Sequence, residues 1–169
     1  MAVALIGSAL LRHPDTPLPD RWNVFEPPSV SDPITPLTHW KLDWATSDPK
    51  RYKEIIQSAG RITKMDDLEV DGACGIVGLT LRRVGVTDNG PIETVCATAL
   101  RIFMWEENGI QSIAQDLFNT QASRIRHVGP YDCRRISGTD RRSTHATAGA
   151  IDILGLDLND STRIRLPED

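Results

Sequence analysis

Two residues in the C-terminal part of the chain, His145 and Asp152, have side chains that could bind a metal ion. An imidazole and a carboxylate are both good zinc ligands. Small residues fill most of the space between them, so the backbone can turn tightly and bring both side chains to one ion. If residues 150–156 form a strand, Asp152 lies on the face opposite Ile151 and Ile153, which belong to the core. The pattern predicts a shared zinc ion, although a histidine and an aspartate seven residues apart are by themselves a weak signal.

The elements that position these residues are predicted from periodicity and turn residues. A helix with apolar positions at helical spacing is expected over 91–108, opened by Pro91 and ended by Gly109, and a second helix over 110–118. Strands are expected over 76–86, 123–128, 150–156 and 162–166, the last two as a hairpin, with an irregular loop over 130–144. This mixture predicts an α+β fold, with helices packed on one face of a small antiparallel sheet.

The N-terminal third differs in composition. Residues 2–11 are an unbroken apolar run, shorter than the roughly 20 residues that span a bilayer. We interpret residues 1–13 as a signal or membrane-anchor remnant, with a buried N-terminal helix as the alternative. Residues 14–36 contain seven of the eleven prolines, which predicts an extended arm over 14–48, anchored by Trp22 and Phe25. A helix is expected to begin near Pro49, after an Asp48 cap, and to stop at Gly60.

Composition narrows the class of partner. A formal net charge of −4 and a pI near 5.5 argue against a nucleic-acid partner, which usually meets a concentrated basic surface. Arginines do gather late in the chain, where they could serve an anionic small ligand or form a solvated face: Arg124, Arg126, Arg134, Arg135, Arg141 and Arg142. The three cysteines form no C-x-x-C pair, which excludes zinc-ribbon and thioredoxin-type sites.

Two sequence runs are similar to motifs of a known family. Residues 143–152, Ser-Thr-His-Ala-Thr-Ala-Gly-Ala-Ile-Asp, resemble the S-x-H-x-x-G-x-A-x-D motif of D-Ala-D-Ala carboxypeptidase and hedgehog-like metallopeptidases. Residues 125–134, Ile-Arg-His-Val-Gly-Pro-Tyr-Asp-Cys-Arg, look like the I-R-H-x-G-x-Y-x-C-R run of bacterial extensin-like proteins, a family in that group. The likeness continues upstream through 91–97, 73–75 and 18–23. The chain is therefore identified as a member of the extensin-like family.

This resemblance implies a protein of the cell wall. Such a protein is exported to the periplasm or anchored to the periplasmic face of the inner membrane through its N-terminus. Its partners are the peptide stems of peptidoglycan, in which zinc-bound water hydrolyses an amide. The implied fold is that of the D-Ala-D-Ala carboxypeptidase and hedgehog-like group.

The resemblance also implies roles for single residues. His145 and Asp152 bind the zinc ion, and Ser143 orients His145, with a local turn bond as the alternative. Arg134 grips a substrate carboxylate or the oxyanion through its planar guanidinium, with a structural ion pair as the alternative. His127 is a candidate substitute ligand, or more simply a supporting or buried histidine.

The chain departs from the family pattern at three points. Ala148 stands at the motif's glycine position, and Tyr52 stands where the family often has a cysteine. The third zinc ligand of the wider group lies on a later H-x-H segment, which does not follow Asp152 here. The extensin-like domain, expected over 49–169, is therefore predicted to be incomplete at its C-terminus and to bind zinc weakly. Two functions stay open: a zinc-dependent peptidoglycan peptidase, and a non-catalytic peptidoglycan-binding or structural module.

In an oxidising compartment, two of the three cysteines should form a disulfide. The candidates are Cys74, Cys96 and Cys133. Cys74 with Cys96 is the expected pair, because the start of a strand and the start of a helix can approach within the Cα separation of about 4.4–6.8 Å that a bridge requires.

Overall fold

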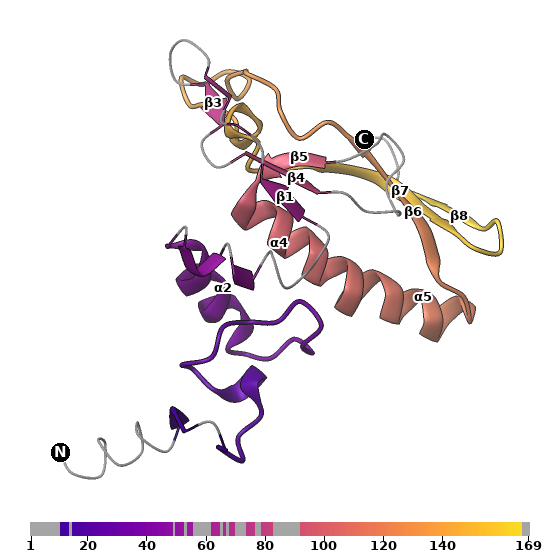
Figure 1. Cartoon of the computed structure of the whole chain (residues 1–169). Helices are drawn as coiled ribbons and strands as arrows, with labels where there is room; N and C mark the ends of the chain where they lie inside the picture. The colour runs from indigo at the N-terminus through magenta and orange to yellow at the C-terminus, as the bar shows by residue number, and fades with distance from the viewer. Residues whose placement is uncertain are drawn as a thin grey trace.

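The computed structural model describes residues 11–13, 15–48, 50–52, 54–55, 62–64, 66, 68–69, 74–76, 79–82 and 92–166. It combines helices with small antiparallel sheets (Figure 1), so the predicted α+β class is confirmed. Residues 1–10, most of the apolar run, lie outside the described ranges. Within those ranges, no helix has the length and apolar character needed to cross a bilayer.

The N-terminal segment contains a short 3-10 helix, η1 (Asp20–Trp22), and helix α2 (Thr38–Thr46). We did not predict α2, since the first helix was expected only from Pro49. A helical turn does follow Asp48, whose Oδ1 accepts a hydrogen bond from Lys50 N at 2.9 Å, as a capping residue does. Residues 50–52 and 54–55 are helical, and the expected end at Gly60 lies outside the described residues.

The proline-rich arm is held by buried polar side chains. Asn23 is fully buried, and its Nδ2 donates to the carbonyl of Leu11 at 2.7 Å. Lys41 of α2 is 1% exposed, and its Nζ donates to the carbonyl of Asp20 at 2.6 Å. Trp22 is 42% exposed, so the prediction that it anchors the arm in an apolar groove is wrong. Carbonyls of an extended segment need donors when they are buried, and these two side chains supply them.

Two small sheets precede the long helix. Strands β1 (Ile62–Lys64), β4 (Leu79–Arg82) and β5 (Ile92–Val95) pair antiparallel in the order β1-β4-β5. Strand β2 (Leu68–Glu69) pairs with β3 (Gly75–Ile76). The single strand predicted over 76–86 is therefore wrong: β3 ends at Ile76, and a second strand starts at Leu79 in another sheet.

A continuous helical rod follows β5. It consists of α4 (Cys96–Trp105), the π-helical turn η2 (Glu106–Ile110) and α5 (Gln111–Phe118), as Figure 1 shows. The helix predicted over 91–108 is wrong at both ends. Side chains of β5 alternate buried and exposed, which is the period of a strand. Gly109 does not end the helix, because the π turn incorporates it; a Cβ there would lie 3.0 Å from Cδ1 of Trp105.

The C-terminal sheet contains β6 (Ala122–Val128), β7 (Asp152–Leu158) and β8 (Arg163–Arg165), antiparallel in that order. The predicted strand near 123–128 and the predicted C-terminal hairpin are confirmed. Asp152 is the first residue of β7, opposite Val128. The β6–β7 register shifts twice, between Ala122 and Arg124 and between Arg126 and His127, which marks two bulges.

Two apolar clusters fix the helices. One joins α2 to α4 through Leu42, Ala45, Ile55, Leu100 and Met104. The other packs the η2–α5 part of the rod on the C-terminal sheet through Ile110, Ala114, Ala122, Ile125 and Leu158. Burying a side chain of this kind stabilises the fold by about 1.5–3 kcal/mol. The helices therefore cover one face of the C-terminal sheet and hold the strand that Asp152 begins.

Candidate functional site

His145 is held in one orientation by two local hydrogen bonds. It belongs to the 3-10 turn η3 (Thr144–Thr147), and the Oγ of Ser143 accepts a hydrogen bond from its backbone N at 3.3 Å. Its Nδ1 lies 3.1 Å from the carbonyl oxygen of Pro130. A carbonyl oxygen only accepts, so Nδ1 carries the proton and Nε2 is left for another partner. Ser143 thus acts as a cap, the local turn bond that the sequence left as an alternative.

Nε2 faces the carboxylate of Asp152. Its Oδ1 lies 3.3 Å from Nε2 of His145, so the predicted approach of the two side chains is confirmed. The imidazole side chain is 10% exposed and the carboxylate 59%, so the pair opens to solvent on the aspartate side. Two donors that each lie about 2.0–2.2 Å from a tetrahedral zinc ion are about 3.3–3.6 Å apart. The donor types and their separation therefore fit two neighbouring corners of a zinc site.

The turn between His145 and Asp152 is fixed to β5 and α4. Ala148 has φ +50 and is fully buried, and its carbonyl accepts hydrogen bonds from Val95 N and from the hydroxyl of Thr94. The hydroxyl of Thr98 donates to the carbonyl of Gly149 at 3.1 Å. The positive φ of Ala148 is a conformation that favours glycine over residues with a side chain. Thr94 and Thr98 were not singled out in the sequence, because their partners are backbone atoms about 50 residues away.

The loop before His145 is a paired ribbon. Ser143 N donates to the Arg134 carbonyl at 3.1 Å, and Asp132 N donates to the His145 carbonyl at 3.0 Å. Arg135 and Arg142 form an isolated antiparallel bridge. The predicted irregular loop over 130–144 therefore has a defined register that leads directly into His145.

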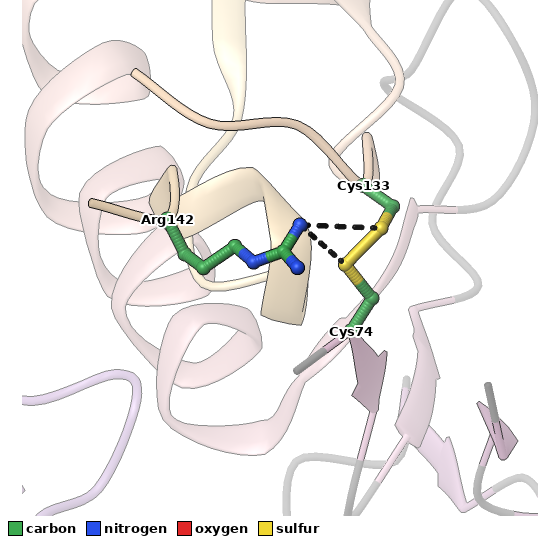
Figure 2. Close-up of a disulfide and its surroundings, with 3 residues drawn as sticks. All are labelled: Cys74, Cys133 and Arg142. Atoms are coloured by element: carbon green, nitrogen blue, oxygen red, sulfur yellow. Dashed lines mark hydrogen bonds between the residues drawn. A yellow bond between two sulfur atoms is a disulfide. The ribbon is translucent and has the colours of Figure 1, made fainter. Parts of the chain in front are cut away.

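A disulfide ties this ribbon to the rest of the fold. Cys133 is bonded to Cys74, with a Cα separation of 5.7 Å, so the prediction of one bridge among three cysteines is confirmed. The predicted Cys74–Cys96 pair is wrong. Cys96 is a free and buried thiol at the start of α4, whereas Cys74 lies beside the ribbon, next to β3. Figure 2 shows the guanidinium of Arg142 against the bridge, with Nη1 3.6 Å from Sγ of Cys74 and 4.0 Å from Sγ of Cys133.

Burial changes the chemistry of Cys96. Desolvation raises the pKa of its thiol to about 12, and a hydrogen bond with the side chain of Tyr52 opposes that shift. Tyr52 therefore contacts the one cysteine that is not bridged.

Arg134 is exposed, and its Nε lies 2.8 Å from Oδ2 of Asp132. Both side chains are more than half exposed, and an ion pair of this kind contributes at most about 1 kcal/mol. The structure thus shows the ion pair that the sequence left as an alternative. A substrate carboxylate could replace Asp132 at little cost, so the predicted role in substrate binding stays a prediction.

His127 lies on the core side of β6, opposite Ile153, and is 3% exposed. Its Nδ1 is 3.2 Å from the carbonyl of Val128. In the part of the chain that the structure describes, no third His, Cys, Asp or Glu joins His145 and Asp152 in a group that could hold a metal. His127 is therefore a buried histidine and does not join His145 and Asp152 in one group.

Comparison with protein families gives one match. The profile of the family described as "Extensin-like protein C-terminus" matches residues 52–169. Neither the curated proteins nor the solved structures gave a match. The matched range contains the disulfide, the ribbon and the His145–Asp152 pair, and it excludes the proline-rich arm.

Proposed function

The chain belongs to the extensin-like protein C-terminus family, and we propose that it is a zinc-dependent hydrolase of peptidoglycan peptide stems. The reaction adds one water across an amide bond of the stem and yields a carboxylate and an amine. This substrate places the protein in the periplasm, free or anchored to the inner membrane through its N-terminus.

The observation that supports this proposal is the His145–Asp152 geometry. Nδ1 of His145 donates to a backbone carbonyl, which orients Nε2 toward Asp152 at 3.3 Å. A histidine whose second nitrogen is held in this way is the usual arrangement of a metal-binding imidazole. His145 and Asp152 would hold the zinc ion, which when bound acidifies a water and polarises the amide carbonyl.

The surrounding residues have supporting roles in this proposal. Ser143 and the Pro130 carbonyl fix the ring of His145, as their hydrogen bonds indicate. Arg134 exchanges Asp132 for a carboxylate of the stem, and its planar guanidinium can bind that carboxylate through two hydrogen bonds. Arg134 thus orients the substrate, while His145 and Asp152 stand at the reacting amide.

One observation favours the alternative, a peptidoglycan-binding module without catalysis. A catalytic zinc site has three protein ligands and an open position. The described residues supply two of them, His145 and Asp152. A third ligand from the remaining residues or a longer chain is required for the hydrolase. Without it, Arg134 and the His145–Asp152 pair would still bind the stem.

The two functions are separated by incubating the protein with purified peptidoglycan and zinc and by measuring released peptides. The hydrolase should release peptides slowly, and a chelator or His145→Ala should abolish the release. His39→Ala is the matched control, because His39 lies on α2 with its side chain 82% exposed. If the wild type sediments with peptidoglycan but releases nothing, the binding module replaces the hydrolase.

A further inference from the structure

Five side chains gather on the outer face of the C-terminal sheet. Arg124, Asp157 and Arg163 stand directly opposite one another across β6, β7 and β8. The next row contains Arg126, Gly155 and Arg165. We call these two rows the arginine face.

The arginine face points away from the core. Ile125, Leu156 and Ile164, which alternate with it along the three strands, pack on the opposite side with the cluster that includes Ile110 of the helical rod. Arg163 and Arg165 are exposed. The helices cover the other side of this sheet, so Arg163 and Arg165 are available to a ligand.

The face carries one ion pair and two further arginines, Arg163 and Arg165. Arg126 holds Asp157 through two hydrogen bonds, Nε to Oδ1 at 2.9 Å and Nη2 to Oδ2 at 2.6 Å. Within the described ranges, neither Arg163 nor Arg165 has an acidic side chain within ion-pair distance, 4.0 Å. Arg163 and Arg165 thus add two positive charges beside the Arg126–Asp157 ion pair, in a chain whose net charge is −4. A local concentration of positive charge on a chain whose net charge is negative attracts anions to this face.

The same face leads to the His145–Asp152 pair. Beyond the bulge at Arg126, Val128 pairs with Asp152, and both are exposed on the side opposite Ile153. A strand rises about 3.3 Å per residue, so the row at Gly155 lies about 10 Å from Asp152 and the row at Asp157 about 16 Å. An extended peptide along β7 with one amide at Asp152 therefore passes over both arginine rows.

We infer that the arginine face binds the free carboxylates of a peptidoglycan stem, while the amide to be cleaved lies at His145 and Asp152. The inference rests on the proposed function for the identity of the substrate. Arginine binds carboxylates through two parallel hydrogen bonds, and a stem peptide has carboxylates beside its backbone. Nucleic acid and membrane are less suited, because the face is small and runs straight into an acidic residue, Asp152. Arg163 and Arg165 then determine which stems are accepted: those with free carboxylates over those with carboxamides.

The test measures the binding of a fluorescent stem peptide with free carboxylates to the full chain, by anisotropy at low salt. The double variant Arg163→Gln/Arg165→Gln should bind about tenfold more weakly, equal to about 1.4 kcal/mol. Arg163→Lys/Arg165→Lys should fall in between, because charge remains but the planar pair of donors is lost. Lys50→Gln/Arg12→Gln removes the same charge from exposed positions outside the three strands of the face and should bind as the wild type does. Equal thermal unfolding of all variants confirms that the fold is intact.

Two further measurements distinguish a failure of the arginine face from a failure of the proposed hydrolase. The wild type should bind the amidated form of the same stem as weakly as the glutamine variant does. His145→Ala should keep arginine-dependent binding even where no hydrolysis occurs, so the surface can be right when the hydrolase is wrong. The inference is overturned if the glutamine variant binds the stem as the wild type does. It is equally overturned if amidation has no effect, or if arginine-dependent binding occurs only on anionic lipid vesicles.

Discussion

The carbonyl oxygen of Pro130 accepts a hydrogen bond from Nδ1 of His145 at 3.1 Å. This contact joins the end of the β6 segment to the turn that precedes β7, and it decides which nitrogen of the imidazole faces Asp152. If the ring were rotated, the protonated nitrogen would face Asp152, where an unprotonated nitrogen is needed to bind a metal. The backbone carbonyl of Pro130 therefore fixes the tautomer of His145 before a ligand binds.

We expect zinc to change the Nε2 resonance of His145 and to leave Nδ1 protonated. The reason is that Nδ1 is engaged with a carbonyl, so only Nε2 has a lone pair to offer. Two-bond ¹⁵N correlation spectra of the imidazole, recorded with and without zinc, measure both nitrogens. A metal-dependent shift at Nδ1 alone would show that the ring is turned the other way.

Cys133→Ser should loosen the ribbon that carries His145. The Cys74–Cys133 bridge spans 59 residues, and a bridge of this kind stabilises a fold by about 2–4 kcal/mol. The ribbon donates to the His145 carbonyl through Asp132 N, so its disorder should also weaken zinc binding. Urea denaturation and zinc titration of the variant measure the two effects. Cys96→Ala, which leaves the bridge intact, is the control, and equal losses in both variants would contradict the account.

The buried thiol of Cys96 predicts a loss of stability at high pH. Its pKa is raised from 9.0 to about 12 in the folded state, first by desolvation. Below pH 9 the thiol is neutral in both states, and its contribution is fully present. Between pH 9 and pH 12 only the unfolded chain releases the proton, so the free energy of unfolding falls with rising pH. Between pH 8 and pH 10, the wild type should lose more stability in urea titrations than Cys96→Ala. Parallel curves would mean that the thiol ionises normally.

Gly155→Ala should separate β8 from β7. A Cβ at this position would lie 2.2 Å from the carbonyl oxygen of Ile164, which is backbone and cannot move aside without breaking the strand pairing. We expect a destabilisation of at least about 2 kcal/mol, measured by thermal or urea unfolding. Gly129→Ala is the matched control, because a Cβ there has no neighbour within 4 Å and should change stability by less than about 0.5 kcal/mol. Equal stabilities of the two variants would show that the register of β7 and β8 is different.

The sequence predicted the C-terminal sheet well, because its strands alternate apolar and polar residues. Ile125 and Leu158 face the core, and Arg124 and Asp157 do not. It failed at Ile92–Val95, where four residues of strand pattern stand directly before a true helix and the helical periodicity dominates. The prediction that the helix ends at Gly109 also failed. Glycine usually ends a helix, but here the π-helical turn includes Gly109 and the helix continues.

The candidate site could be predicted only in part. The His145–Asp152 approach follows from residue types and the small residues between them, and the structure has it at 3.3 Å. The hydrogen bonds of Pro130 and Thr94 to this turn were beyond prediction, because they depend on where distant backbone atoms lie. The cysteine pairing failed for the same reason: three cysteines allow three pairs, and only the folded ribbon brings Cys133 to Cys74.

Isothermal zinc titration of the wild type, His145→Ala, Asp152→Asn and His39→Ala tests the central claim most directly. The wild type and His39→Ala should bind one zinc ion per chain. The free energy of binding should be smaller than the roughly 10–16 kcal/mol of complete structural sites. His145→Ala and Asp152→Asn should each lose most of that affinity. Each removes one of the two ligand atoms, Nε2 of His145 and Oδ1 of Asp152, which lie 3.3 Å apart. If His145→Ala and Asp152→Asn bind zinc as the wild type does, or if the wild type binds none, the pair is an ion pair and not a metal site.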